Sequence, residues 1–198
     1  MQVDRALRLA IRNFSTLFLT VAVVTVTLHL VYSFFFKDVL AVSHLHQEVS
    51  VLSPNVNLQG VGSKDLSTSE IVYWILTAVE IVLIPVFVAA AARVIQVEKG
   101  GGVPTVPDAY GHLGEGWRGL SLRSVRRGWV TILLAALIAL GIGFFFERAG
   151  LLLTEFLPID WLFLGAGLVR GLSRAVGAPF FLAAVVATGQ SPPKDVNP

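Results

Sequence analysis

The sequence predicts an all-α integral membrane protein with four transmembrane helices arranged as two hairpins. Of its 198 residues, 55% are hydrophobic and 14% are charged, and the mean hydropathy is +0.74. An average soluble domain has about 25% charged residues, so this chain has too little charge for a water-facing surface. It has no Cys, which excludes a disulfide scaffold, and its 13 Phe and long aliphatic runs exclude disorder.

Four apolar runs supply the helices, because a hydrocarbon core of about 30 Å requires about 20 apolar residues in a helix. The predicted spans are residues 14–36, 71–94, 129–146 and 161–188. The first run is longer than the 7–15 residues or so of a signal-peptide core, so we interpret it as a retained anchor. The fourth span has an alternative, a crossing at 151–169 followed by a re-entrant or surface helix at 176–188.

The charges between these spans alternate in sign. Segment 1–13 has a net charge of +2, loop 37–70 of −2, loop 93–128 of +3 and segment 147–160 of −2. Lys and Arg are enriched in cytoplasmic loops. We therefore expect both termini to be cytoplasmic. We expect the protein to lie in the cell membrane, specifically a bacterial inner membrane.

The two hairpins resemble each other, which predicts an internal duplication. One set of matches has a constant offset of 115 residues: Leu7, Arg8, Arg12, Phe14, Thr16 and Leu19 correspond to Leu122, Arg123, Arg127, Trp129, Thr131 and Leu134. A Pro-x-Phe-aliphatic-Ala-Ala run then occurs at 85–90 and again at 179–184. The repeats would be parallel, since each hairpin starts and ends on the same side.

This pattern divides the chain into four parts. Residues 1–97 form the first hairpin, with the outer loop 37–70, and residues 129–188 form the second. Between them, 98–128 is a Gly/Pro-rich cytoplasmic connector with a basic amphipathic segment, and 189–198 is a flexible tail. Basic side chains before the first span of each half are predicted to contact the inner leaflet: Arg5, Arg8, Arg12, Arg123, Arg126 and Arg127.

Three charged residues lie inside the predicted spans: Glu80, Arg170 and Arg174. Charges at this depth are costly unless they are paired or hydrated. Glu80 precedes Pro85 by five residues, and Arg174 precedes Pro179 by five, so the two occupy equivalent positions in the repeats. We predict that Glu80 pairs with Arg174, with Arg170 as a second partner or a contact to a water path. The pair would either fix the packing of the hairpins or line a polar pathway.

Two other features of the spans concern their packing. Pro85 and Pro179 permit helix kinks. Gly167 and Gly171 fit the small-xxx-small pattern of close helix contact.

Candidate ligands for metals and cofactors are few. His44, His46 and Glu48 alternate in the outer loop and are weak candidates for a divalent metal, without an evident fourth ligand. His29, in the outer half of the first span, is a weak candidate ligand for a haem or pigment. The sequence has no catalytic motif and no nucleic-acid-binding motif, so we predict no cofactor, no enzymatic activity and no nucleic-acid partner.

One layout resembles a known group. Residues 6–14 carry a basic start before an Asn-Phe pair, and a Pro-containing segment at 104–109 leads to a second basic run before Trp129. This arrangement, over residues 5–150, resembles uncharacterised bacterial multi-pass proteins of the glycerophosphoryl diester phosphodiesterase membrane-domain type. The resemblance implies a membrane module of unassigned activity. The hydrolase barrel of the phosphodiesterases is absent, so their catalysis is not implied.

Two functions follow as expectations. The first is a non-enzymatic accessory or scaffold subunit of a larger membrane complex, with the bilayer and other membrane subunits, or a second copy of itself, as partners. The alternative is a small transporter-like or channel-like component that acts as an oligomer through the intramembrane Glu/Arg site.

Overall fold

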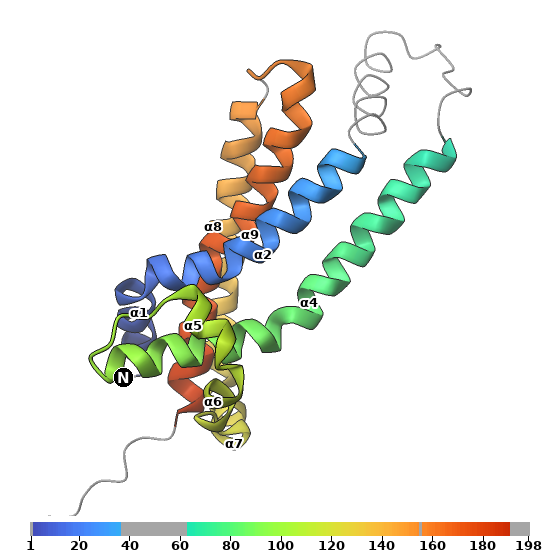
Figure 1. The fold of residues 1–198 in the computed structure, drawn as a ribbon. Coiled ribbons are helices and arrows are strands. Elements are labelled where there is room, and N and C mark those ends of the chain that lie inside the picture. The colour runs from blue at the N-terminus through green and yellow to red at the C-terminus, as the bar shows by residue number, and fades with distance from the viewer. Residues whose placement is uncertain (1, 37–62, 155, 191–198) are drawn as a thin grey trace, which may run out of the picture.

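The computed structural model describes residues 2–36, 63–154 and 156–190, and its regular elements there are all helices. Four of them are long and apolar enough to cross a membrane: Phe14–Phe35, Ile71–Lys99, Trp129–Thr154 and Trp161–Gly189. The prediction of an all-α chain with four membrane-spanning helices is confirmed at this level. Figure 1 shows the helices and their order.

A short basic helix precedes the first span. Helix α1 (Gln2–Arg12) ends at Asn13, and α2 (Phe14–Phe35) starts directly after it. On α1, Ala6 and Ala10 are buried, and Ala6 packs in a cluster with alanines of the last helix. The opposite side of α1 exposes apolar and basic side chains. This exposed side carries Arg8 and Arg12, two of the arginines predicted to contact the inner leaflet.

Helix α4 (Ser63–Lys99) is the longest helix and contains Pro85. It bends near its middle in Figure 1, as expected where a proline removes a backbone donor. Most side chains from 71 to 84 are exposed or half-buried, whereas 87–92 are buried. The half of α4 after Pro85 therefore belongs to the core, and the half before it contacts the other helices through a few side chains, among them Tyr73 and Glu80.

Three short helices replace the single basic segment predicted for the connector. They are α5 (Val106–Gly111), α6 (Leu113–Arg118) and α7 (Leu122–Arg127). Arg93 on α4 holds the first two, through Asp108 at 3.2 Å and Glu115 at 2.6 Å. The Tyr110 hydroxyl donates a hydrogen bond to the Thr20 carbonyl at 2.5 Å, which ties α5 to α2.

The second hairpin comprises α8 (Trp129–Thr154) and α9 (Ile159–Gly189). Helix α8 continues through Glu147 to Thr154, so the predicted span end at 146 was too early and Glu147 is not in an outer loop. Helix α9 is continuous, which contradicts the alternative crossing at 151–169. The apolar sequence on either side of Glu147 favours continued helix over a turn.

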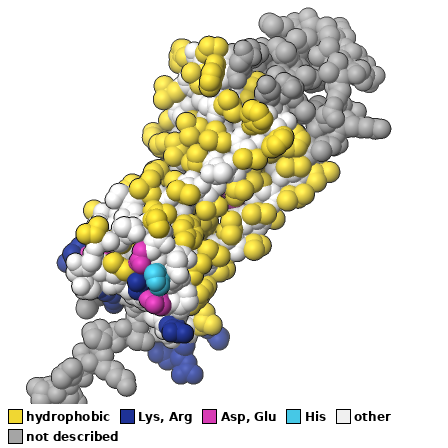
Figure 2. Space-filling view, in the orientation of Figure 1, with side chains coloured by type: hydrophobic (Ala, Val, Ile, Leu, Met, Phe, Trp, Pro, Cys, Tyr) yellow, Lys and Arg dark blue, Asp and Glu magenta, His cyan; other side chains and the backbone are white. Residues whose placement is uncertain are grey.

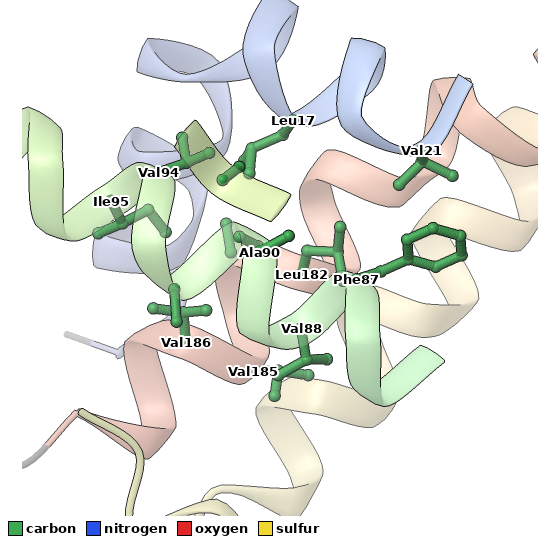
Figure 3. Packing of buried hydrophobic residues seen from close by; sticks show 14 of the residues in the cluster. Leu17, Val21, Phe87, Val88, Ala90, Val94, Ile95, Leu182, Val185 and Val186 are labelled. Atoms are coloured by element: carbon green, nitrogen blue, oxygen red, sulfur yellow. The ribbon is translucent and has the colours of Figure 1, made fainter. Parts of the chain in front are cut away.

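The bundle has two distinct ends. We call the end that carries α1, α5, α6 and α7 the connector end, and the opposite end, where α2 and α8 finish and α9 begins, the loop end (Figure 1). In Figure 2, hydrophobic side chains cover the flank of the bundle, and Lys and Arg gather at the connector end. The main core, shown in Figure 3, joins α2, α4 and α9 near that end through residues such as Leu17, Ile95 and Leu182.

Helix α9 is the central element of the bundle. It packs extensively against both α2 and α8, while α4 contacts α2 and α9 more sparsely. Helices α2 and α8 begin 115 residues apart, at Phe14 and Trp129, which is the offset of the sequence matches. The tighter packing of α8 on α9 than of α4 on α2 makes the two hairpins unequal, and the duplication stays a prediction.

Candidate functional site

A cluster of ionisable side chains lies inside the bundle, away from both ends. Glu80 comes from the part of α4 before Pro85, Arg174 is the middle residue of α9, and His29 lies in the last third of α2. At 1.5 Å per residue, His29 lies about 7 Å from the midpoint of α2 toward the loop end. The cluster therefore falls within the hydrocarbon depth that these helices span.

Glu80 lies between the other two residues. Its Oε1 is 3.0 Å from Nε2 of His29, and its Oε2 is 3.7 Å from Nε of Arg174. The structure thus brings together the two residues whose pairing the sequence predicts, and adds a third.

His29 is 2% exposed, and its Nδ1 has no hydrogen-bond partner. An imidazole that donates from Nε2 to the carboxylate leaves Nδ1 as an unprotonated acceptor. This tautomer avoids a buried N–H group without a partner, so we assign it. The haem or pigment role considered for His29 would require Nε2 or Nδ1 as the ligand, and Nε2 is already used by Glu80.

A second acid–base pair lies closer to the loop end. Nε of Arg170 is 3.9 Å from Oε1 of Glu147 on α8, and its guanidinium carbon is 6.0 Å from the centre of the Tyr73 ring on α4. Arg170 thus contacts Glu147 and Tyr73. Its ion pair is with Glu147, and not with Glu80, the partner considered from the sequence. The sequence prediction omitted Glu147 because it placed that residue in the outer loop.

Both ion pairs are loose. Separations of 3.7 and 3.9 Å exceed the length of a hydrogen bond. The Arg174 and Arg170 side chains are 40% and 32% exposed, and each guanidinium has five N–H donors. Within the described residues, these two guanidinium groups therefore keep donors that no recorded hydrogen bond uses.

The cluster borders an open groove of about 640 Å³ between α4 and α8. Both helices line it, although they make little direct contact with each other, and α2 and α9 form its floor. Most of the lining is apolar. The polar side chains in it are Thr25, Thr77, Glu80, Glu147, Ser173 and Arg174.

Core side chains line the groove toward the connector end. Val21, Phe87 and Leu182 line it there, and they are 4%, 6% and 2% exposed. These three side chains belong to the core cluster of α2, α4 and α9 (Figure 3). The polar groups of the groove are thus separated from the connector end by packed apolar side chains.

Glycines of α9 set the distance between α9 and α2. A Cβ on Gly171 would lie 2.5 Å from Val26 Cα, and one on Gly167 would lie 2.9 Å from the His29 carbonyl oxygen. Thr25 Oγ1 also donates to the Gly171 carbonyl at 2.9 Å. The Gly167–Gly171 pair therefore packs within the bundle, against the turn of α2 that carries His29.

The two prolines occupy different environments. Pro85 follows the exposed half of α4, at the bend, whereas Pro179 is fully buried within α9. Pro85 thus separates the part of α4 that lines the groove from the part in the core.

The basic side chains predicted to contact lipid are at the connector end. Arg8 pairs with Asp4, and Arg12 pairs with Glu98 of α4. The Arg8 guanidinium lowers the pKa of Asp4 below its usual value, through a hydrogen bond. Arg5 is half-buried, and those on α7 (Arg123, Arg126 and Arg127) are exposed.

Neither the metal nor the family prediction receives support. His44, His46 and Glu48 lie outside the described residues, and within 2–36, 63–154 and 156–190 no group of three His, Asp or Glu could hold a metal ion. No family model, no curated protein and no solved structure matches this chain. The layout resemblance to the phosphodiesterase membrane domains therefore stays a prediction.

Proposed function

We propose that this chain is a non-enzymatic membrane protein of transporter-like type, whose groove between α4 and α8 admits a polar group into the membrane. The observation that supports it most is the position of Glu80 and Arg174. They line a groove at hydrocarbon depth instead of facing each other inside a closed core. Ionisable side chains at such depth typically mark pathways for ions or substrates.

The looseness of the ion pairs supports the same proposal. A pair that serves only packing gains most from short, fully used hydrogen bonds, because desolvating two charges is otherwise poorly compensated. Here the carboxylate–guanidinium separations are 3.7 and 3.9 Å, and both guanidinium groups are partly exposed. Water or a polar ligand in the groove would supply the missing hydrogen bonds.

The distribution of Lys and Arg supports an orientation of the bundle in the membrane. The connector end carries the basic residues of α1 and α7, which favours a cytoplasmic location for that end and for both termini. We propose a bacterial inner membrane as the compartment. The groove would then open toward the outer side, and the core of Val21, Phe87 and Leu182 would separate it from the cytoplasm.

Single-cysteine labelling tests the proposal directly, because the natural chain has no Cys. Thr77→Cys and Leu140→Cys place a thiol in the groove, on α4 and α8; Thr77 is half-buried and Leu140 is 64% exposed. Phe145→Cys is the matched control, since Phe145 is 75% exposed on α8 and does not line the groove. Thiols react as thiolates, so a membrane-impermeant maleimide labels only hydrated sites efficiently.

We expect both groove cysteines to be labelled from the outer side in sealed vesicles, and the Phe145→Cys control to remain unlabelled. Labelling only from the cytoplasmic side would contradict the orientation. Groove cysteines that react no faster than the control from either side would contradict a hydrated site.

An accessory or scaffold role is the second candidate, and the exposure of α8 favours it. Only 6% of the apolar window of α8 is buried within the bundle, against 67% for α9. A partner helix could pack on this face. Purification in a mild detergent followed by mass spectrometry tests this role: a stoichiometric membrane-protein partner supports it, and a chain that purifies alone or as a homo-oligomer contradicts it.

A further inference from the structure

The charges beside the groove are balanced but incompletely satisfied. Glu80 and Glu147 provide two carboxylates, Arg170 and Arg174 provide two guanidinium groups, and the assigned tautomer of His29 is neutral. Neither acid–arginine pair is within hydrogen-bond distance. The site therefore offers two acid–arginine pairs, about one turn of α9 apart. Each pair has N–H donors and carboxylate lone pairs that remain available to a ligand.

The depth of these groups suits a lipid headgroup. Helix α8 has 26 residues and is about 39 Å long, so it exceeds a hydrocarbon core of about 30 Å. With α8 centred in the core, Glu147 lies about 8 Å from the midplane, and thus about 7 Å below the hydrocarbon edge. The ammonium of a headgroup would reach Glu147 at about that depth below the hydrocarbon edge. The phosphate would lie about one helical turn deeper, where it would reach Arg174.

The walls of the groove suit an acyl chain. The exposed half of α4 contributes Ile81 and Ile84, and α8 contributes Leu140 and Phe144. Because α4 and α8 barely touch, an apolar chain can lie between them alongside the bilayer lipids. A volume of about 640 Å³ is within the range of pockets that hold small ligands.

We propose that this groove binds a phospholipid with a primary ammonium headgroup, such as phosphatidylethanolamine. The phosphate accepts hydrogen bonds from the guanidinium of Arg174, the ammonium donates to the carboxylate of Glu147, and an acyl chain lies between α4 and α8. This inference rests on the proposed function, because it assumes that a polar group enters the groove.

Charge balance selects a zwitterion over an anion or a cation. The four charged side chains sum to zero, so an anionic lipid would leave a net negative charge in a medium of low dielectric constant, and a cation would leave a net positive one. A zwitterion leaves the sum unchanged and supplies both missing partners. A primary ammonium is favoured over choline because choline has no N–H to donate to Glu147.

Lipid competition in nanodiscs, read out by native mass spectrometry, tests the proposal on the whole chain. The unmodified protein is placed in discs that contain equal amounts of phosphatidylethanolamine, phosphatidylcholine and phosphatidylglycerol with identical acyl chains. We expect one retained phosphatidylethanolamine per chain, preferred by at least about tenfold over each competitor, the factor that one lost charge-assisted hydrogen bond represents. Equal retention of the three lipids, or a preference for phosphatidylglycerol, would overturn the proposal.

Two substitutions then locate the site. Glu147→Gln and Arg174→Gln should each reduce the preference to about twofold or less, while Arg148→Gln should leave it unchanged. Arg148 is the matched control, because it is exposed on α8 next to Glu147 and lies over the Phe144 ring at 5.2 Å without lining the groove. An unchanged preference in the Glu147→Gln variant would exclude this site. The lipid preference of the unmodified chain remains a test that no misfolded variant affects.

Cysteine labelling separates a failure here from a failure of the proposed function. If Thr77→Cys is labelled but the chain shows no lipid preference, the hydrated groove stands and the lipid assignment is wrong. If it is not labelled and no lipid is retained, both proposals are wrong. In discs enriched in phosphatidylethanolamine, occupancy of the groove should slow the labelling of Thr77→Cys relative to phosphatidylcholine discs, and equal rates would contradict occupancy.

Discussion

Replacing Arg174 by glutamine removes the guanidinium 3.7 Å from Glu80 and leaves that carboxylate with the neutral His29 as its recorded partner. Breaking a buried ion pair costs about 3–5 kcal/mol, because one charge remains buried without compensation. Glu80 is 13% exposed but Arg174 is 40% exposed, so solvent screening should reduce the cost below this range, to about 2–3 kcal/mol. Glu80→Gln should cost a similar amount, since it leaves the guanidinium unpaired.

The double variant Glu80→Gln, Arg174→Gln has no unpaired charge and should be less destabilised than the sum of the single variants. We expect a coupling energy of about 1–2 kcal/mol, within the range for residues in one network. Equilibrium unfolding in bicelles, for the four proteins of the cycle, measures it. The cycle of Glu80→Gln with Arg148→Gln is the control and should show no coupling. Additivity within about 0.5 kcal/mol in the Glu80–Arg174 cycle would refute the pairing.

Three further predictions concern packing, pH and topology. Gly171→Ala should destabilise the bundle by about 1–3 kcal/mol in the same unfolding assay, because its Cβ would meet Val26 backbone, while Gly141→Ala, with no atom within 4 Å of its Cβ, should be neutral or stabilising. Burial raises the pKa of Tyr110 to about 12, so the contribution of Tyr110 to the free energy of unfolding should be intact below pH 10, where the unfolded phenol is neutral, and lost between about pH 10 and 12. Tyr110→Phe should remove this pH dependence together with the hydrogen bond to Thr20. A Tyr110→Phe variant with an unchanged alkaline unfolding transition would contradict the role of Tyr110. A C-terminal fusion to a reporter active only in the cytoplasm should be active, and activity of a periplasm-specific reporter at the same position would contradict the four-span topology.

The helices could be predicted from the sequence because a single physical property specifies them. Apolar runs of about 20 residues have few alternatives in a membrane, so all four spans begin at their predicted starts, Phe14, Ile71, Trp129 and Trp161. Helix ends were less predictable. Glu147 and Arg148 resemble a loop by charge, yet α8 continues past them to Thr154. Glu147 faces Arg170 and Arg148 lies over the Phe144 ring, so neither charge requires the helix to end.

The candidate site could be predicted only in part. Repeat alignment placed Glu80 and Arg174 at equivalent positions, and the two lie together in the structure. The same argument says nothing about His29, whose position depends on how closely α2 approaches α9 at Gly167 and Gly171. Glu147 was missed because no periodicity relates it to Arg170, and only the antiparallel register of α8 and α9 brings the two together. The outer-loop residues His44, His46 and Glu48 lie outside the described part of the chain and stay untested.

Helix periodicity links the packing of α9 to the chemistry of the groove. Gly167 and Gly171 are four residues apart and form one ridge, and Arg170 and Arg174 form a second ridge three residues further along. At 3.6 residues per turn, a displacement of three residues is about 300°, so the two ridges are neighbours about 60° apart on the helix surface. The glycine ridge draws α2 close to α9, and the adjacent arginine ridge then points beside α2 toward α4. His29 and Arg174 can both reach Glu80 for this reason, and a larger side chain at Gly171 should therefore weaken the His29–Glu80 contact as well as the packing.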